Sequence, residues 1–329
     1  MTRQTKNFLF CSVGRRGELI KNCKASLNSN VKIVATDCSK FAPALYFADK
    51  QYIVPRIDDP SYLDVLLNIC NVEKIDAITT LIDPEIQILS ENRKMFEAIG
   101  VEVLAPYSET SNLCIDKFKL YQHAVKNNIA TVPTYENIDE FNQALSNETI
   151  HFPVFVKPRF GSGSVGAKKV ENYEKLKILI AEDENLIIQK YISGLDIDAD
   201  VYIDTVSKKP VRIFTKIKLE TTIGGANKTI SFKNKELVRV IQKIIQTLDF
   251  NGPIDIDFFN VDGVYYLSEI NPRFGGAYLH AFGAGVDFFK CIVNNLDGIE
   301  NELDYDSYDE DIVMMMYDSV IIRKEKELG

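Results

Sequence analysis

The chain has 329 residues, of which 46% are hydrophobic and 26% are charged. These proportions are ordinary for a globular protein, and the length suits two or three compact lobes better than one core. The formal net charge of −9 argues against a general nucleic-acid-binding surface, because binding to phosphate backbones requires a basic field.

The sequence carries no signal for secretion or membrane insertion. The N-terminus is polar and is followed by only a short apolar strand, and no apolar run approaches the ~20 residues needed to span a bilayer. The six cysteines are scattered along the chain without a metal-like pairing. We therefore expect a cytoplasmic protein with reduced cysteines and with no nucleic-acid or membrane partner.

The first third of the chain alternates short apolar strands with helices. We predict strands at residues 8–13, 31–36, 77–81 and 101–104, and helices at 17–27, 62–70 and 85–99. Such alternation implies a parallel sheet wound by right-handed crossovers. The sequence therefore predicts a Rossmann-like unit over roughly residues 1–112.

From Asp116 onward the pattern changes to longer strands joined by hairpin turns. We predict helices at 117–127 and 138–145, and strands at 154–157, 186–191, 198–204, 211–218 and 312–316. The acidic run after Asn301 is interpreted as a solvated loop. The fold class is therefore α/β, with the parallel unit followed by an α+β unit.

A hairpin near the C-terminus carries the first candidate site. Its strands flank Asp262-Gly263, a pair of residues typical of a hairpin turn. Because strand side chains alternate between faces, Asp257, Glu269 and Asn271 are predicted to share one face. Three hard oxygen ligands beside Arg273 suit magnesium bound to a polyphosphate. An acidic hairpin rim that binds nothing is the alternative.

A glycine-rich segment, Gly161 to Gly166, follows the strand that ends at Lys157. Its three glycines let the backbone approach a ligand closely, and its amides can point together at an anion. A flexible hairpin tip would look the same. Lys157 favours the phosphate-binding interpretation, because a lysine directly before such a loop can reach a phosphate as a point charge.

These motifs, in this order, resemble the ATP-grasp superfamily of carboxylate–amine ligases, and most closely the large subunits of carbamoyl-phosphate synthases and the stand-alone ligases related to them. The resemblance covers roughly residues 8–290 and rests on several spaced motifs. Lys117, which follows Asp116 at a helix start, resembles the first ATP-binding lysine of the family, and Lys157 resembles the second. The glycine segment resembles the mobile loop that closes on the phosphates.

The segment from Gln189 to Asp196 resembles the hinge of the family, whose backbone hydrogen-bonds adenine. Asp196 stands where a glutamate usually binds the ribose hydroxyls, and Gln189 stands where glutamate is common. The resemblance assigns the following residues to the nucleotide: Lys117, Lys157, Gly161, Ser162, Gly163, Ser164, Val165, Gly166, Gln189, Lys190, Tyr191, Ile192 and Asp196.

The resemblance assigns the metal to Asp257, Glu269 and Asn271, with Mg²⁺ as the expected ion and Mn²⁺ as a possible substitute. Asp255 is an alternative to Asp257 as the first metal ligand, because it lies two residues away on the same face of the strand. Arg273 resembles the arginine that contacts the phosphates, and it is expected to be catalytic.

Lys218 is also expected to be catalytic, since it and Lys216 lie on a strand that would face the cleft. An ordinary solvated edge strand is an equal alternative for this lysine pair.

The resemblance implies three units: a Rossmann-like domain over 1–112, a small ATP-grasp lobe with a glycine-rich lid over 113–192, and a large lobe with the metal site and the tail over 193–329. It implies an ATP-dependent ligase that joins a small-molecule carboxylate to an amine through an acyl phosphate and releases ADP and phosphate. A homodimer is one possible assembly.

Three other functions stay open. Carbamoyl phosphate synthesis needs two phosphorylations, whereas the sequence shows one ATP-grasp unit. A regulatory module with a degenerate nucleotide site is disfavoured by the intact lysines and carboxylates. An NAD-dependent oxidoreductase would rest only on Gly14-Arg15-Arg16-Gly17 and on Asp37, an incomplete dinucleotide fingerprint.

Two further features lie at the expected carboxyl edge of the first sheet, where open α/β sheets bind ligands. In the related ligases this domain helps to hold a substrate, so Arg15 or Arg16 could pair with a carboxylate. Asp83, directly before Pro84, is interpreted as a helix N-cap, and the role of Glu85 is left open.

Overall fold

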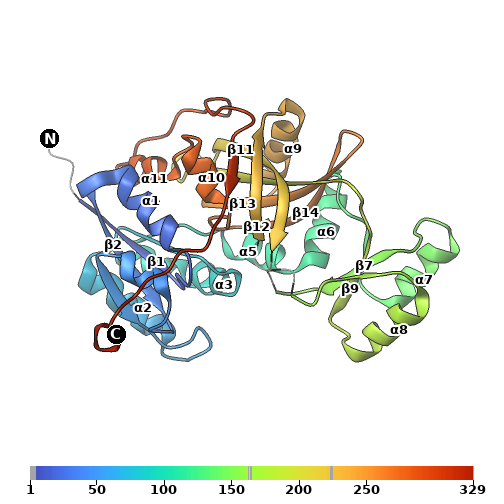
Figure 1. Ribbon diagram of the computed structural model, residues 1–329, viewed down its shortest axis with the longest axis horizontal. Coiled ribbons are helices and arrows are strands. Elements are labelled where there is room, and N and C mark those ends of the chain that lie inside the picture. The colour runs from blue at the N-terminus through green and yellow to red at the C-terminus, as the bar shows by residue number, and fades with distance from the viewer. Residues whose placement is uncertain (1–4, 162, 164, 223–224, 329) are drawn as a thin grey trace.

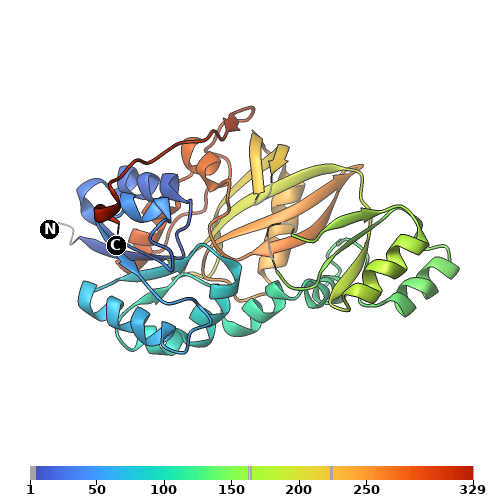
Figure 2. The ribbon, with the colours of Figure 1, turned by 60° about the horizontal axis from the view of Figure 1, so that its bottom comes forward.

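The computed structural model describes residues 5–161, 163, 165–222 and 225–328, so the predictions for Ser162 and Ser164 lie outside the described residues. Three β-sheets follow one another along the long axis of the molecule (Figures 1 and 2). A five-stranded parallel sheet lies at the N-terminal end, a six-stranded antiparallel sheet lies in the middle, and a four-stranded antiparallel sheet lies at the far end. The mixed α/β class is confirmed.

The first sheet has the strand order β3-β2-β1-β4-β5, and all its pairs are parallel. Its strands are β1 (Lys6–Cys11), β2 (Val31–Asp37), β3 (Lys50–Ile53), β4 (Ala77–Thr80) and β5 (Glu102–Val103). Helix α1 (Gly17–Leu27) covers one face, and α2 (Tyr62–Glu73), α3 (Asp83–Glu91) and α4 (Arg93–Glu97) cover the other. This is the predicted Rossmann-like arrangement.

A single helix was predicted over residues 85–99, and this prediction is wrong because the segment forms two helices, α3 and α4. The chain breaks at Asn92, whose side-chain amide donates to the carbonyl of Ile88. Within the first third of the chain, the predicted elements also omit β3 and α5 (Ser108–Ile115). Strand β3 is short and polar, and α5 begins with five polar residues, so neither shows apolar periodicity.

The four-stranded sheet has the order β6-β9-β7-β8. Its strands are β6 (Thr134–Tyr135), β7 (Val154–Pro158), β8 (Lys168–Val170) and β9 (Leu186–Lys190), and its helices are α7 (Ile138–Ser146) and α8 (Tyr173–Glu182). Phe141 of α7 and Leu176 of α8 share one apolar cluster with the sheet. Both helices therefore pack on the same core, at the right of Figure 1.

The central sheet has the order β14-β13-β10-β11-β12-β15. Its strands are β10 (Leu195–Ile203), β11 (Pro210–Thr222), β12 (Gly225–Phe232), β13 (Gly252–Val261), β14 (Val264–Asn271) and β15 (Val313–Met315). One face packs on α6 (Lys117–Lys126) and α9 (Lys235–Ile245). The opposite face is charged at one end and aromatic at the other.

The aromatic end of that face joins the central sheet to the first domain. Tyr202 and Phe214 belong to the same buried cluster as Phe8 and Phe10 of β1. Helices α10 (Tyr278–Gly283) and α11 (Phe288–Leu296) lie between the two sheets and contact α1. The two units thus share one hydrophobic core.

The C-terminal segment leaves β15 and runs back along the first domain, as Figures 1 and 2 show. Asp318 lies 3.7 Å from Arg15, and Glu325 lies 4.0 Å from Lys40. Both pairs are exposed, so they contribute little stability. Within the described part of the chain, no helix has the length and apolar character required to cross a membrane.

The buried His280 on α10 predicts a pH-dependent stability. Burial, and then the nearby charge of Lys216, lower the pKa of His280 from 6.5 to about 4. The unfolded chain would therefore take up a proton on this residue near pH 6.5, whereas the folded chain stays neutral until about pH 4. Stability present above pH 6.5 is lost as the pH falls through this window.

We expect His280→Gln to flatten that pH dependence, because glutamine can keep a hydrogen bond to Thr229 without titrating. Urea unfolding between pH 6.5 and pH 4 should show a decline smaller by roughly 2–3 kcal/mol in the variant than in the wild type. Equal declines in the two proteins would contradict this assignment.

Candidate active site

The charged face of the central sheet is produced by alternation along four neighbouring strands. On β10, Asp196, Asp198 and Asp200 occupy alternate positions. The strand register places Asp198 opposite Lys216 on β11 and opposite Asp257 on β13. Asp257 in turn lies opposite Glu269 on β14, and Asp255 lies opposite Asn271. Because directly opposed side chains share a face, these groups form one charged surface.

The outer part of this surface contains the predicted metal ligands. The ammonium of Lys218 contacts the carboxylate of Asp257 and lies 3.1 Å from Asp196 Oδ1. The Asn271 amide donates to both Asp255 and Asp257, with each distance 3.3 Å. The predicted shared face is therefore observed, and Lys218 lies within it.

The inner part is a buried charge cluster around Lys216. Its ammonium lies 3.1 Å from Asp198 Oδ1 and also contacts Asp200, and all three side chains are at least 95% buried. The expectation that Lys216 faces the cleft is wrong, because it neutralises carboxylates inside the protein. Lys218, one pleat further along β11, is the more exposed lysine of the two, with 13% of its side chain exposed.

The cluster shifts the ionisation of its members in opposite directions. Burial, followed by the charges of Asp198 and Asp257, raises the pKa of Asp255 well above its ordinary value. Burial acts to raise the pKa of Asp198 as well, but Lys216 and a hydrogen bond with Asp255 hold it below its ordinary value. Asp255 is buried among these carboxylates, whereas Asp257 lies opposite Glu269 and is partly exposed, so Asp257 is the better candidate for a metal ligand.

The backbone also approaches this cluster closely at Gly275. A Cβ atom there would lie 2.7 Å from Asp255 Oδ1 and 2.8 Å from Asp200 Oδ1. Real Cβ atoms are not found at such distances, so only glycine fits against the two carboxylates.

Lysines of the four-stranded sheet and of α6 approach the same surface. Lys117 is buried, lies 3.6 Å from Glu269 Oε1, and donates to the carbonyl of Gly161. Burial lowers the pKa of Lys157, and the charge of Glu269 acts against that effect. The structure thus brings both predicted ATP-binding lysines together with Glu269.

The glycine segment forms the tip of the β7–β8 hairpin. Gly161, Gly163 and Gly166 all have positive φ angles, which only glycine adopts freely. Val165 is 72% exposed. Among the described residues of this segment, Gly161 contacts Lys117 and the side chain of Val165 lies largely in solvent.

The predicted hinge residues lie where the chain passes from β9 to β10. Gln189 is buried, and its amide donates to Thr134 Oγ1 at 2.8 Å. The backbone N–H of Lys190 donates to Pro133, and Tyr191 lies under the ammonium of Lys169. Ile192 is partly buried in the same crossing. These residues connect the small sheet to the strand that carries Asp196.

Arg273 follows β14 and is held by the first domain. Its Nε lies 2.8 Å from Asp83 Oδ1, and its Nη2 donates to Asp83 Oδ2 at 3.0 Å. The interpretation of Asp83 as a helix cap is wrong. Ile82 occupies the N-cap position of α3, and Asp83 is the first helical residue and faces Arg273.

The other candidates in the first domain have structural partners. Arg16 donates to the carbonyls of Gly275 (2.8 Å) and Phe274 (3.3 Å), whereas Arg15 is 88% exposed near Asp318. The carboxyl of Glu85, which was left open, is fully buried and accepts hydrogen bonds from Tyr62 and Thr80.

Asp37 has structural partners as well, because its carboxylate accepts from the backbone N–H groups of Gly14 (2.8 Å) and Ser39 (2.9 Å). This use of Asp37 weakens the interpretation as a dinucleotide fingerprint.

The donor set fits a hard divalent cation. Asp257, Glu269 and Asn271 supply carboxylate and amide oxygens, the ligands that Mg²⁺ prefers. Both carboxylates already lie against ammonium groups, of Lys218 and Lys117 respectively. Positive charge is therefore stabilised at this position.

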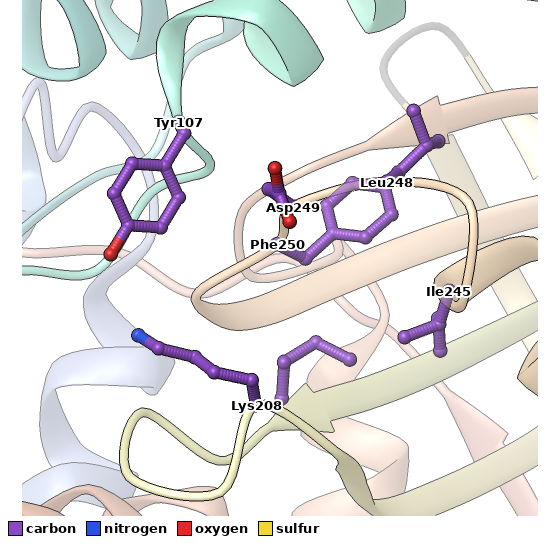
Figure 3. A pocket seen from close by; sticks show the side chains of 7 residues that line it. Tyr107, Lys208, Ile245, Leu248, Asp249 and Phe250 are labelled. Carbon is purple, nitrogen blue, oxygen red and sulfur yellow. The ribbon is translucent and has the colours of Figure 1, made fainter.

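A cavity of about 300 Å³ lies elsewhere, at the end of β10 and before the start of β13. Figure 3 shows its lining side chains, with the ammonium of Lys208 extending toward the ring of Tyr107, 5.6 Å from the ring centre. None of the predicted site residues lines this cavity.

Sequence reasoning missed two parts of the site. Asp198 and Asp200 were not singled out, although the alternation of three aspartates from Asp196 along one strand was a visible signal. The contact between Asp83 and Arg273 carried no such signal, since 190 residues separate the two.

Comparisons with known proteins agree with this arrangement. Residues 8–104 match the PylC-like N-terminal domain family, and residues 114–277 match the ATP-grasp domain family. Residues 114–277 form an ATP-grasp domain. The chain is 26% identical over 302 residues to a carbamoyl-phosphate synthase of Methanobrevibacter smithii, covering 84% of this chain and 79% of that protein. It spans only about a quarter of the longer carbamoyl phosphate synthase large chains that it also matches.

Two solved structures have the same fold as this ATP-grasp protein. N5-carboxyaminoimidazole synthetase from Staphylococcus aureus, complexed with ADP, superposes with a TM-score of 0.73 at 20% identity, covering 92% of this chain and 80% of that one. L-amino acid ligase from Bacillus licheniformis gives a TM-score of 0.68 at 18% identity, covering 92% and 76%.

The two lysines of β11 form a matched pair for mutagenesis. We expect Lys216→Met to destabilise the fold by about 3–5 kcal/mol, because it leaves buried carboxylates without a counter-charge. Lys218→Met should cost less, since Asp196 beside it is 37% exposed and can be hydrated. Urea unfolding of both variants measures the difference. A similar loss of unfolding free energy in both variants would show that the two lysines do not differ in their contribution to stability.

Proposed function

We propose that this protein is an ATP-dependent ligase that joins a carboxylate to an amine, with ADP and phosphate as products. The observation that carries the proposal is the convergence of Lys117 and Lys157 on the carboxylate face that holds Glu269 and Asp257. Cations from α6 and from the four-stranded sheet, beside metal-type ligands on the central sheet, would form a site for a metal-bound polyphosphate.

The proposed roles follow the geometry. The two lysines and the loop from Gly161 to Gly166 would bind the phosphates, and the hinge from Gln189 to Ile192 would bind adenine, with Asp196 near the ribose. Asp257, Glu269 and Asn271 would hold Mg²⁺ or Mn²⁺. When bound, this metal would neutralise negative charge on the phosphates.

The reaction would proceed in two displacements. A carboxylate oxygen attacks the γ-phosphorus of ATP, the bond to the β–γ bridging oxygen breaks, and ADP leaves. The amine nitrogen then attacks the acyl carbon, loses a proton and expels phosphate. Arg273 and Lys218 would stabilise the transferring group, and closure of the glycine loop would exclude water from the acyl phosphate.

A second candidate is the carboxyphosphate chemistry of carbamoyl phosphate synthesis. It is favoured by the similarity to the Methanobrevibacter smithii enzyme, which this chain covers for most of its length. The fold of L-amino acid ligase is compatible with the first candidate. The two candidate reactions differ in whether bicarbonate replaces the organic carboxylate as the substrate that is phosphorylated.

The remaining expectations are part of the same proposal. The domain limits at 112 and 192, a cytoplasmic location and a homodimer are proposed on the basis of the sequence. The N5-carboxyaminoimidazole synthetase structure, which contains ADP, supports the nucleotide class, because its fold matches over most of this chain.

Trapping with hydroxylamine tests the reaction class. We expect ATP to be converted to ADP, and a hydroxamate to form, when the protein is screened with panels of carboxylates and hydroxylamine replaces the amine. Glu269→Gln should abolish both products while Glu236→Gln, on the exposed surface of α9, should leave them unchanged. AMP and pyrophosphate as products would contradict the proposal. Turnover with bicarbonate and ammonia alone would favour the second candidate.

A further inference from the structure

The first domain contacts the residues that follow β14 at two points. Asp83 contacts Arg273 through two nitrogen–oxygen pairs, at 2.8 and 3.0 Å. Arg16 donates to the carbonyls of Phe274 and Gly275. The residues immediately after the predicted metal ligand Asn271 are therefore positioned by the first domain, and not by their own sheet alone.

The contact between Asp83 and Arg273 combines one hydrogen bond with a close ion-pair contact. Arg273 Nη2 donates to Asp83 Oδ2, and Nε lies 2.8 Å from Oδ1 without forming a hydrogen bond. Together the two contacts restrict the orientation of the guanidinium as well as its distance. Both side chains are mostly buried, with 17% of Asp83 and 13% of Arg273 exposed. Asp83 is itself fixed, because it opens α3 directly before Pro84, where a carboxylate also interacts favourably with the helix dipole.

The ion pair does not use all the donors of Arg273. A guanidinium has five N–H groups. One on Nη2 donates to Asp83 and one on Nη1 donates to the carbonyl of Phe274 at 3.1 Å, whereas the Nε–H has no hydrogen-bond partner among the described residues. The remaining N–H groups keep the capacity to bind a phosphoryl oxygen while Asp83 holds the plane of the guanidinium.

We propose that Asp83 is a positioning residue for Arg273, and that the first domain thereby completes the phosphoryl-transfer site of the ATP-grasp domain. This inference rests on the proposed function, since it takes Arg273 to contact the transferring group. It adds that the arginine acts only when the first domain supplies the carboxylate that orients it.

A purely structural ion pair is the alternative, and the protein offers one for comparison. Lys6 of β1 lies 2.8 Å from Asp297 and also links the first domain to the C-terminal part of the chain. None of the predicted site residues takes part in that pair. Removing it tests what loss of an interdomain ion pair does by itself.

The experiment compares the binding of MgADP with that of MgADP and aluminium fluoride, which mimics the phosphoryl group in transfer. We expect Asp83→Asn to weaken binding of the fluoride complex by about tenfold or more, because outer-sphere partners have effects of this size. Binding of MgADP should change less than twofold. Asp83→Glu should recover part of the loss, and Lys6→Met should change neither affinity.

A double variant shows whether Asp83 acts through Arg273. In an Arg273→Ala background, Asp83→Asn should cause no further loss of affinity for the fluoride complex. An additional, independent loss would overturn the inference, as would an equal weakening of both ligands by Asp83→Asn. Failure of the wild type to bind MgADP would instead refute the proposed function, and the inference with it.

Discussion

The structure depends on the neutralisation of carboxylates by lysine on one face of the central sheet. Asp198 and Asp200 are buried there at a cost that only a close counter-charge can offset, and Lys216 lies between them. The same pattern repeats one pleat outward, where Lys218 lies between Asp196 and Asp257, which are partly exposed. A buried charge cluster and the proposed metal site are thus two parts of one surface.

This surface is where the other parts of the chain meet the central sheet. The four-stranded sheet contributes Lys157 and α6 contributes Lys117, and the carboxylate of Glu269 lies near both lysines. The first domain contributes Asp83, which pairs with Arg273. Each unit therefore brings a charge that complements the central sheet, and phosphoryl transfer requires such preorganised charge more than a covalent nucleophile.

The fold and much of the site could be predicted from the sequence because their signals are local. Strand alternation places Glu269 and Asn271 on one face, and the spacing of the glycines is enough to mark the loop. Asp257 shares that face because the register shifts between Asp257 and Phe258, which leaves Ser268 without an opposite residue, and no local pattern predicts this shift. The role of Lys216 could not be predicted in this way. Lys216 and Lys218 occupy equivalent alternate positions on β11, and only the packing of neighbouring elements buries one completely and leaves the other partly exposed.

Contacts between segments far apart in the sequence could not be predicted either. Asp83 before Pro84 fits the local pattern of a helix cap. Its carboxylate instead pairs with the guanidinium of Arg273, which lies 190 residues away in the sequence. Arg16 likewise belongs to a loop that resembles part of a dinucleotide motif, but it binds the backbone after β14. Local patterns predict the helices and strands. The partners of Asp83 and Arg16 depend instead on how the first domain packs against the residues after β14.

The charged face of the central sheet is expected to bind a divalent metal together with a nucleotide. Electron paramagnetic resonance of Mn²⁺, titrated into the protein in the presence of ADP, measures this binding. We expect the wild type to bind Mn²⁺, and Glu269→Gln to weaken this binding by about tenfold or more while keeping the native fold. Equal Mn²⁺ affinity in the two proteins would contradict the assignment of the site.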